Sequence, residues 1–154
     1  MLLSAACQGG ATEPGPVLGR APAKVQAASD TATLAGSVLT VEAFLWRDFQ
    51  PPRARDGRPL IAAVRVRGAG GAPVPDGVQA DSLWVVSGGQ AWAARPVQEQ
   101  PRVRDQRGDY LEFMARNGPM WAPETRADVA VRVRDGAGRV AYLRVADRVI
   151  ARTN

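Results

Sequence analysis

Apolar and polar residues alternate along most of the chain beyond residue 36. The clearest case is residues 128–134, where Val129, Val131 and Val133 occupy every second position. Successive side chains of a strand point to opposite faces of a sheet, so this period of two predicts a half-buried β-strand. We predict strands at residues 37–46, 60–67, 82–86, 91–95, 110–116, 128–134 and 139–145, with 149–150 as a short terminal strand or the end of one.

Turn-forming residues separate these runs. Residues 87–90 are Ser-Gly-Gly-Gln, whose glycines permit the positive φ angles of a hairpin turn. Residues 117–119 (Asn-Gly-Pro) and 135–138 (Asp-Gly-Ala-Gly) mark two further turns. Residues 68–77 are a predicted loop, and the polar segment 96–108 is either a long loop or a ragged sheet edge. No apolar period of 3.6 residues persists for ten residues, which argues against a substantial helix. The pattern therefore predicts an all-β fold, a two-sheet antiparallel sandwich of seven to eight strands.

The number and spacing of these strands, and the aromatic residues placed in them, resemble the immunoglobulin-like and fibronectin type III-like sandwiches. The resemblance covers the domain that we assign to residues 36–154. An antibody-type domain carries a Cys–Trp–Cys core, but no cysteine follows Cys7. We therefore expect Trp84 or Trp92 to fill the space between the sheets. Because these two residues flank a short hairpin, they are also candidates for a cross-strand pair.

The first ten residues carry a separate signal. Two leucines are followed by small residues and then by the single cysteine of the chain, in the order Leu2-Leu3-Ser4-Ala5-Ala6-Cys7. This resembles the lipobox of bacterial lipoproteins, although Ser4 stands where the family usually has Leu and only six residues precede Cys7. The resemblance implies a truncated signal sequence, a lipid on Cys7, export, and a place in the cell envelope. Gln8, rather than Asp, after the cysteine favours the outer membrane if the cell has one; the alternative is that Cys7 is a chance free thiol.

Residues 8–35 are rich in Ala, Gly, Pro, Gln, Ser and Thr, with four charges and no aromatic residue. Such a segment buries too little apolar area to offset the entropy lost on ordering. We therefore predict a flexible, disordered tether between the membrane anchor and the domain, with at most a weak transient helix in 23–35. No stretch approaches the 18 or so apolar residues needed to span a bilayer.

The chain carries a formal charge of +5, with 20 basic and 15 acidic residues, and every basic residue but Lys24 is arginine. The two signs are interspersed, so we expect a mixed solvated surface and consider nucleic acid an unlikely partner. Arg65 and Arg67 share one strand face, as do Arg132 and Arg134. If these strands were aligned in one sheet, the four guanidiniums would form a basic stripe for phosphates or acidic glycans. The simpler alternative is an outer face on which carboxylates pair with them.

Several chemistries are excluded by residue type. The chain has no histidine and one cysteine, which rules out a Ser-His-Asp triad, a histidine zinc site and an internal disulfide. The glycine-rich segments 68–71 and 136–138 join predicted strands rather than opening a helix, so neither is a phosphate loop. The strand-end aspartates show no catalytic or calcium-binding spacing. We predict no catalytic residue, no metal and no cofactor.

Trp121, in the loop 118–123, is the tryptophan that we expect to be most exposed, and exposed indoles can stack on sugar rings. Two hypotheses follow. The first is a non-enzymatic, lipid-anchored envelope protein whose sandwich is an interaction or structural module for an unknown protein or glycan partner. The alternative is a carbohydrate- or anionic-polymer-binding module that uses Trp121 and the arginine face.

Overall fold

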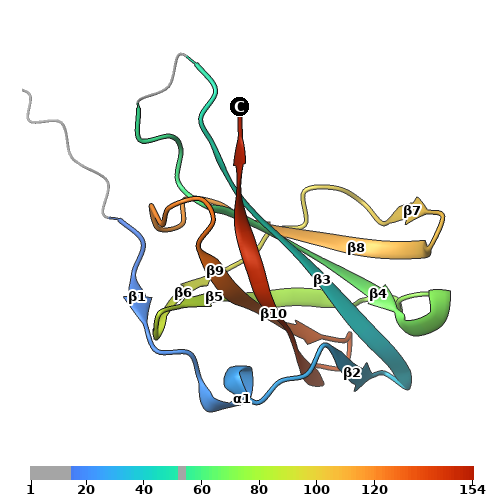
Figure 1. Cartoon of the computed structure of the whole chain (residues 1–154). Helices are drawn as coiled ribbons and strands as arrows, with labels where there is room; N and C mark the ends of the chain where they lie inside the picture. The colour runs from blue at the N-terminus through green and yellow to red at the C-terminus, as the bar shows by residue number, and fades with distance from the viewer. Residues whose placement is uncertain (1–14, 52–54) are drawn as a thin grey trace, which may run out of the picture.

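The computed structural model describes residues 15–51 and 55–154 as an all-β sandwich with one helical turn (Figure 1). The predicted all-β fold is confirmed, with ten strands in the described residues instead of seven or eight. The elements are β1 (Leu18–Gly19), α1 (Ala23–Gln26), β2 (Thr31–Leu34), β3 (Ser37–Asp48), β4 (Ile61–Gly68), the 3₁₀ turn η1 (Ala69–Gly71), β5 (Gln79–Ser87), β6 (Gln90–Ala94), β7 (Val103–Asp105), β8 (Gly108–Ala115), β9 (Arg126–Arg134) and β10 (Val140–Thr153).

The strands pair in the order β1-β6-β5-β9-β10-β3-β4-β8-β7, and β2 pairs with β3. We call the layer β1-β6-β5-β9-β10 sheet A and the layer β2-β3-β4-β8-β7 sheet B. From β3 onward, the order β3-β4-β8-β7 in one layer and β10-β9-β5-β6 in the other is that of an immunoglobulin-like sandwich. The resemblance seen in the sequence therefore extends to the topology. None of the helices in the described residues is long and apolar enough to cross a bilayer.

Strand β10 belongs to both layers. Its first part, 140–145, pairs antiparallel with β9, and its last part, 150–153, pairs parallel with residues 45–48 of β3. A register shift between Val145 and Arg148 interrupts the pairing with β9, which resumes at Arg148 and Val149, and Asp147 in this shift adopts a positive φ of 60°. The predicted strand at 149–150 is thus the continuation of β10. This parallel pairing is a departure from the antiparallel sandwich that the sequence predicts.

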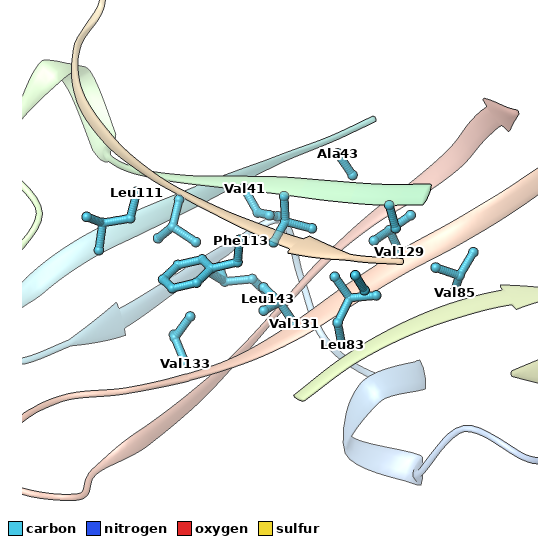
Figure 2. Close-up of a cluster of buried hydrophobic side chains, with 14 of the residues drawn as sticks. Val41, Ala43, Leu83, Val85, Leu111, Phe113, Val129, Val131, Val133 and Leu143 are labelled. Atoms are coloured by element: carbon cyan, nitrogen blue, oxygen red, sulfur yellow. The ribbon is translucent and has the colours of Figure 1, made fainter. Parts of the chain in front are cut away.

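The core lies between the two sheets and follows the predicted alternation. Val129, Val131 and Val133 are fully buried, and Figure 2 shows them among side chains from both layers, with Phe113 and Leu143 close by. Their burial removes apolar area from water, and this stabilises the packing of the two layers by roughly 1.5–3 kcal/mol for each large side chain. The sandwich is therefore held by this strip of inward residues.

Trp92 fills the core as expected, but Trp84 does not pair with it. Trp92 lies opposite Val85 in the β5–β6 ladder, whereas Trp84 lies opposite Ala93 and points to the other face of sheet A. The expected cross-strand pair is wrong because the register places the two indoles on opposite faces. A Cβ at Gly118 would come within 2.6 Å of the Trp92 ring, so the glycine of the predicted 117–119 turn allows this close approach.

The N-terminal segment is the largest correction to the sequence prediction. Residues 18–34, which we call the strap, are not part of a flexible tether. In Figure 1 the strap runs in blue from β1, on the edge strand β6, through α1 to β2, which pairs with β3. Val25 of α1 is 1% exposed, packed against Ala91 and Ala130 of sheet A. The predicted domain boundary at Gly36 falls inside the tight β2–β3 hairpin, where Ala35 and Gly36 have positive φ.

The strap is ordered because the outer face of sheet A is apolar. Trp84 and Tyr142 stack there, with ring centroids 6.1 Å apart, and Val86, Ala91 and Ala130 lie beside them. Covering these residues offsets the entropy of ordering a segment that has little apolar surface of its own. Of the two alternatives for residues 96–108, the sheet edge is the one observed, since the segment contains the short edge strand β7.

Candidate functional site

The four predicted arginines lie on two different faces. Arg65 and Arg67 project from the outer face of sheet B on β4, and Arg132 and Arg134 from the outer face of sheet A on β9. The inward residue Val66 separates the first pair, and the inward residue Val133 separates the second. The sandwich therefore does not align the four guanidiniums in one stripe.

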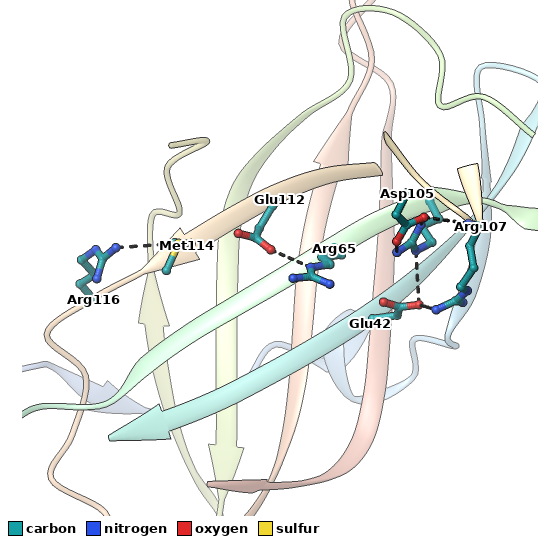
Figure 3. A network of polar contacts seen from close by, with 8 residues as sticks. Glu42, Arg65, Asp105, Arg107, Glu112, Met114 and Arg116 are labelled. Carbon is teal, nitrogen blue, oxygen red and sulfur yellow. Dashed lines mark hydrogen bonds and ion pairs between the residues drawn. The ribbon is translucent and has the colours of Figure 1, made fainter. Parts of the chain in front are cut away.

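Cross-strand register gives Arg65 and Arg67 carboxylate partners. Arg65 lies between Glu42 on β3 and Glu112 on β8, and its Nε donates to Glu112 at 2.7 Å. Arg67 donates to both oxygens of Asp105 at 2.8 and 2.6 Å, and its Nε lies 3.3 Å from Glu42. Figure 3 shows this row of contacts, which Arg107 extends by binding Glu42. We call Glu42, Arg65, Arg67, Asp105, Arg107 and Glu112 the arginine ladder.

Aromatic rings complete the ladder. The Cζ of Arg65 lies 4.8 Å from the ring centroids of both Phe44 and Tyr110, and that of Arg67 lies 4.6 Å from Tyr110. Guanidiniums stacked on rings in this way gain cation–π attraction. Arg67 is only 4% exposed although it lies on an outer face, because Tyr110 and Asp105 cover it. The ladder is thus a charge-balanced surface in which three arginines pair with three carboxylates.

On sheet A the two arginines differ. Arg132 donates to both oxygens of Asp81 at 2.7 and 2.9 Å. Arg134 is exposed, and among the described residues it has no salt-bridge partner. Three of the four candidate arginines are therefore engaged with carboxylates, as in the simpler alternative derived from the sequence.

Trp121 is half-buried and packs against the core instead of standing free. Its loop is fixed by Arg47, which is 4% exposed and donates to the carbonyls of Trp121 at 3.1 Å and Met120 at 3.3 Å. The same guanidinium donates to the Arg58 carbonyl at 2.8 Å and to that of Asp56. Burial lowers the pKa of Arg47 despite the nearby Asp56 charge. Sequence reasoning missed this residue, although it continues the inward positions of β3.

The strap and sheet A line a pocket of about 570 Å³ that opens to solvent, which we call the strap cavity. Ala21 and Val25 form its apolar roof, and Val86 and Ala130 its apolar floor. Its polar lining comprises Arg20 and Gln26 from the strap, Asp128 from β9 and Arg144 from β10. The Arg144 guanidinium donates to Asp128 at 2.8 Å, and the backbone N–H of Asp147 donates to the other oxygen of Asp128 at 3.0 Å.

Where the surroundings shift the pKa of a carboxyl group in the described residues, they lower it. Hydrogen bonds from Arg67 lower the pKa of Asp105 to about 2, and hydrogen bonds from Arg132 lower the pKa of Asp81. Burial opposes the shift at Asp128, but the hydrogen bonds from Arg144 and the Asp147 backbone outweigh it and lower its pKa. A general acid at neutral pH needs a raised pKa, so these carboxylates are suited to ion pairing rather than proton transfer.

Cys7 lies outside the described residues. Within residues 15–51 and 55–154, no three His, Cys, Asp or Glu side chains gather where they could hold a metal ion.

Comparisons with known proteins give one structural neighbour. No protein-family model and no curated protein sequence matches the chain. Among solved structures, the crystal structure of a DUF4426 family protein from Pseudomonas aeruginosa PAO1 matches with a TM-score of 0.44 and 11% sequence identity. The match covers 80% of this chain and 95% of that one. At this TM-score the likeness carries no functional argument.

Proposed function

We propose that the protein is a non-enzymatic, lipid-anchored component of the bacterial cell envelope whose immunoglobulin-like domain is an interaction or structural module. The observation that carries the proposal is the position of the single cysteine, Cys7, after two leucines and two alanines. A lipid on this residue would anchor the domain to a membrane. Its partner, a protein or a glycan, is unidentified.

The position of the strap supports an anchor close to the domain. Strand β1 begins at Leu18, eleven residues beyond Cys7, where the sequence alone predicts a tether reaching Ala35. Eleven residues span at most about 40 Å even when fully extended. A lipid on Cys7 would therefore hold the sandwich within about 40 Å of the membrane surface, with β1 and β6 as the edge nearest the anchor.

The engaged charges support a binding or structural role over catalysis. The shifted carboxyl groups all have lowered pKa values, and each takes part in an ion pair with arginine. The geometry gives less support to the alternative of glycan or polyanion binding by Trp121 and the arginines. That alternative needs an exposed indole and unpaired guanidiniums, whereas Trp121 packs on the core and Arg65, Arg67 and Arg132 are paired.

Metabolic labelling with palmitate in the bacterial cell tests the anchor. The full gene product should incorporate label and partition with membranes, and the Cys7→Ser variant should lose both properties. The Gln8→Ser variant, which changes the neighbouring residue and keeps the thiol, is the matched control and should label like the wild type. Equal labelling of the wild type and Cys7→Ser would overturn the proposal.

A further inference from the structure

The strap cavity differs from the hydrophobic core, whose space is filled by side chains, and from the arginine ladder, whose charges are paired. On the neighbouring part of the sheet A outer face, Trp84 and Tyr142 occupy the space above the strands. Under the strap, the corresponding positions carry the small side chain of Ala130 and the short one of Val86. Val25 and Ala130 are buried against each other, and the open volume of about 570 Å³ lies beside this contact, next to Val86 and Gly89 of the β5–β6 turn. This volume lies in the range of small-molecule sites.

The charges of the lining favour an anion. Two arginines, Arg20 and Arg144, and one carboxylate, that of Asp128, line the cavity, which leaves one net positive charge. Asp128 is already satisfied on both oxygens, by Arg144 and by the Asp147 backbone. Arg20 has no salt-bridge partner among the residues that the structure describes. Its guanidinium is therefore available for a charge-assisted hydrogen bond to an anionic group.

We infer that the strap cavity binds a small amphiphilic anion, a molecule with one carboxylate-like group and a short aliphatic body. The aliphatic part lies along Val86 at the edge of the Val25–Ala130 contact, and the anionic group lies beside Arg20 and Arg144. Such a ligand contacts the strap and the sheet together, so its binding stabilises the strap in place. The inference concerns residues 20–144 and does not depend on a lipid at Cys7.

Titration of the full 154-residue chain with octanoate tests the site, with acetate as the anion lacking a chain and 1-octanol as the chain lacking a charge. For a ligand of this size we expect a dissociation constant on the order of 1 mM. Amide shifts in ¹H–¹⁵N spectra should centre on Ala130, Arg144 and the strap. Acetate and 1-octanol should each bind at least about tenfold more weakly, because each lacks half of the recognised chemistry.

Variants assign the binding to the cavity. Ala130→Leu fills the floor and should abolish octanoate binding, whereas Arg20→Gln, an exposed change that leaves the core intact, should weaken it about fivefold. The matched control is Arg134→Gln, an exposed arginine on the same face of sheet A, which should bind octanoate like the wild type. If Ala130→Leu detaches the strap, seen as rapid exchange of the Val25 amide, Arg20→Gln alone decides.

Several results would overturn the inference. They are equal binding by Arg20→Gln and wild type, 1-octanol binding as tightly as octanoate, acetate binding as tightly as octanoate, and shifts that centre away from the strap. None of these results depends on palmitate labelling, so failure here and failure of the lipid anchor are separate outcomes.

Discussion

The two outer faces of the sandwich are covered by different means. On sheet A, a segment from elsewhere in the chain, the strap, lies over Trp84, Ala91 and Ala130. On sheet B, the face covers itself, since the side chains of Arg65 and Arg67 stack on rings and pair with carboxylates of neighbouring strands. The first cover depends on apolar burial, and the second on charge and hydrogen bonding.

This difference teaches how outward residues specify what covers a sheet. Outward positions that alternate as Arg and Glu can satisfy one another across strands, so the face is complete without a further element. Outward positions occupied by Trp, Ala and Val cannot do so, and they leave an apolar patch that a neighbouring segment must bury. Salt should weaken the ladder of sheet B more than the strap of sheet A.

The largest effect is expected when the strap is dislodged. Val25→Asp places a carboxylate against Ala130 and Ala91 with no partner, and we expect unfolding stability to fall by about 3 kcal/mol. Urea unfolding measures the loss, and hydrogen exchange should show the strap amides exposed while those of β9 stay protected. Lys24→Asp, an exposed change on the same helical turn, is the control. If both variants lose the same stability, Val25 does not hold the strap.

A smaller effect is expected on the other face. Arg67→Met removes the guanidinium that binds Asp105 and Glu42, and we expect a loss of about 2 kcal/mol. The loss is less than for a fully buried pair, because the Asp105 and Glu42 carboxylates are 37% and 24% exposed and regain water. Arg104→Met removes an arginine that is 82% exposed and should change stability by under about 0.5 kcal/mol. Equal losses, measured by urea unfolding, would mean that Arg67 acts as an ordinary surface residue.

The smallest and most specific effect is a pH dependence. Arg67 lowers the pKa of Asp105 from its ordinary 3.8 to about 2. Because the folded-state pKa is depressed, the pair stabilises the fold fully above about pH 4, and this contribution is lost as pH falls through about 2. The stability difference between wild type and Asp105→Asn should therefore shrink across this window. Asp76→Asn, at a fully exposed carboxylate, should show no such change in denaturant unfolding from pH 2 to 6; a constant difference for Asp105→Asn would contradict the pairing.

The strands of the sandwich could be predicted from the sequence because their inward residues recur with a period of two. Val129, Val131 and Val133 illustrate this, since the burial of each follows from its alternation with the residues next to it in the chain. The strap could not be predicted in the same way, because its own residues show no period. The available signal lay far away, in the apolar outward positions Trp84 and Ala130, which indicate that something covers them.

The candidate residues depended on register, which the sequence does not show. Whether Arg65 is free or paired is decided by Glu42 and Glu112 lying directly opposite on β3 and β8. The same holds for the two tryptophans of the β5–β6 hairpin. Trp92 lies opposite Val85 and not opposite Trp84, so the two indoles point to opposite faces. Arg47 could have been found, since an arginine at an inward position of a strand needs buried acceptors. Those acceptors, the carbonyls of two distant loops, are visible only in the fold.

The double pairing of strand β10 has a consequence for how the protein folds. The strand pairs with β9 in sheet A and with β3 in sheet B, so neither layer has its full set of strand pairings until residues 140–153 have docked. Before β10 docks, the edges of β9 and β3 that it covers are unpaired, and unpaired strand edges are prone to aggregation. Packing of the strap depends on β10 as well, because α1 contacts this strand. Both layers are therefore completed by one and the same strand, so closure of the sandwich is a single step that depends on the docking of β10.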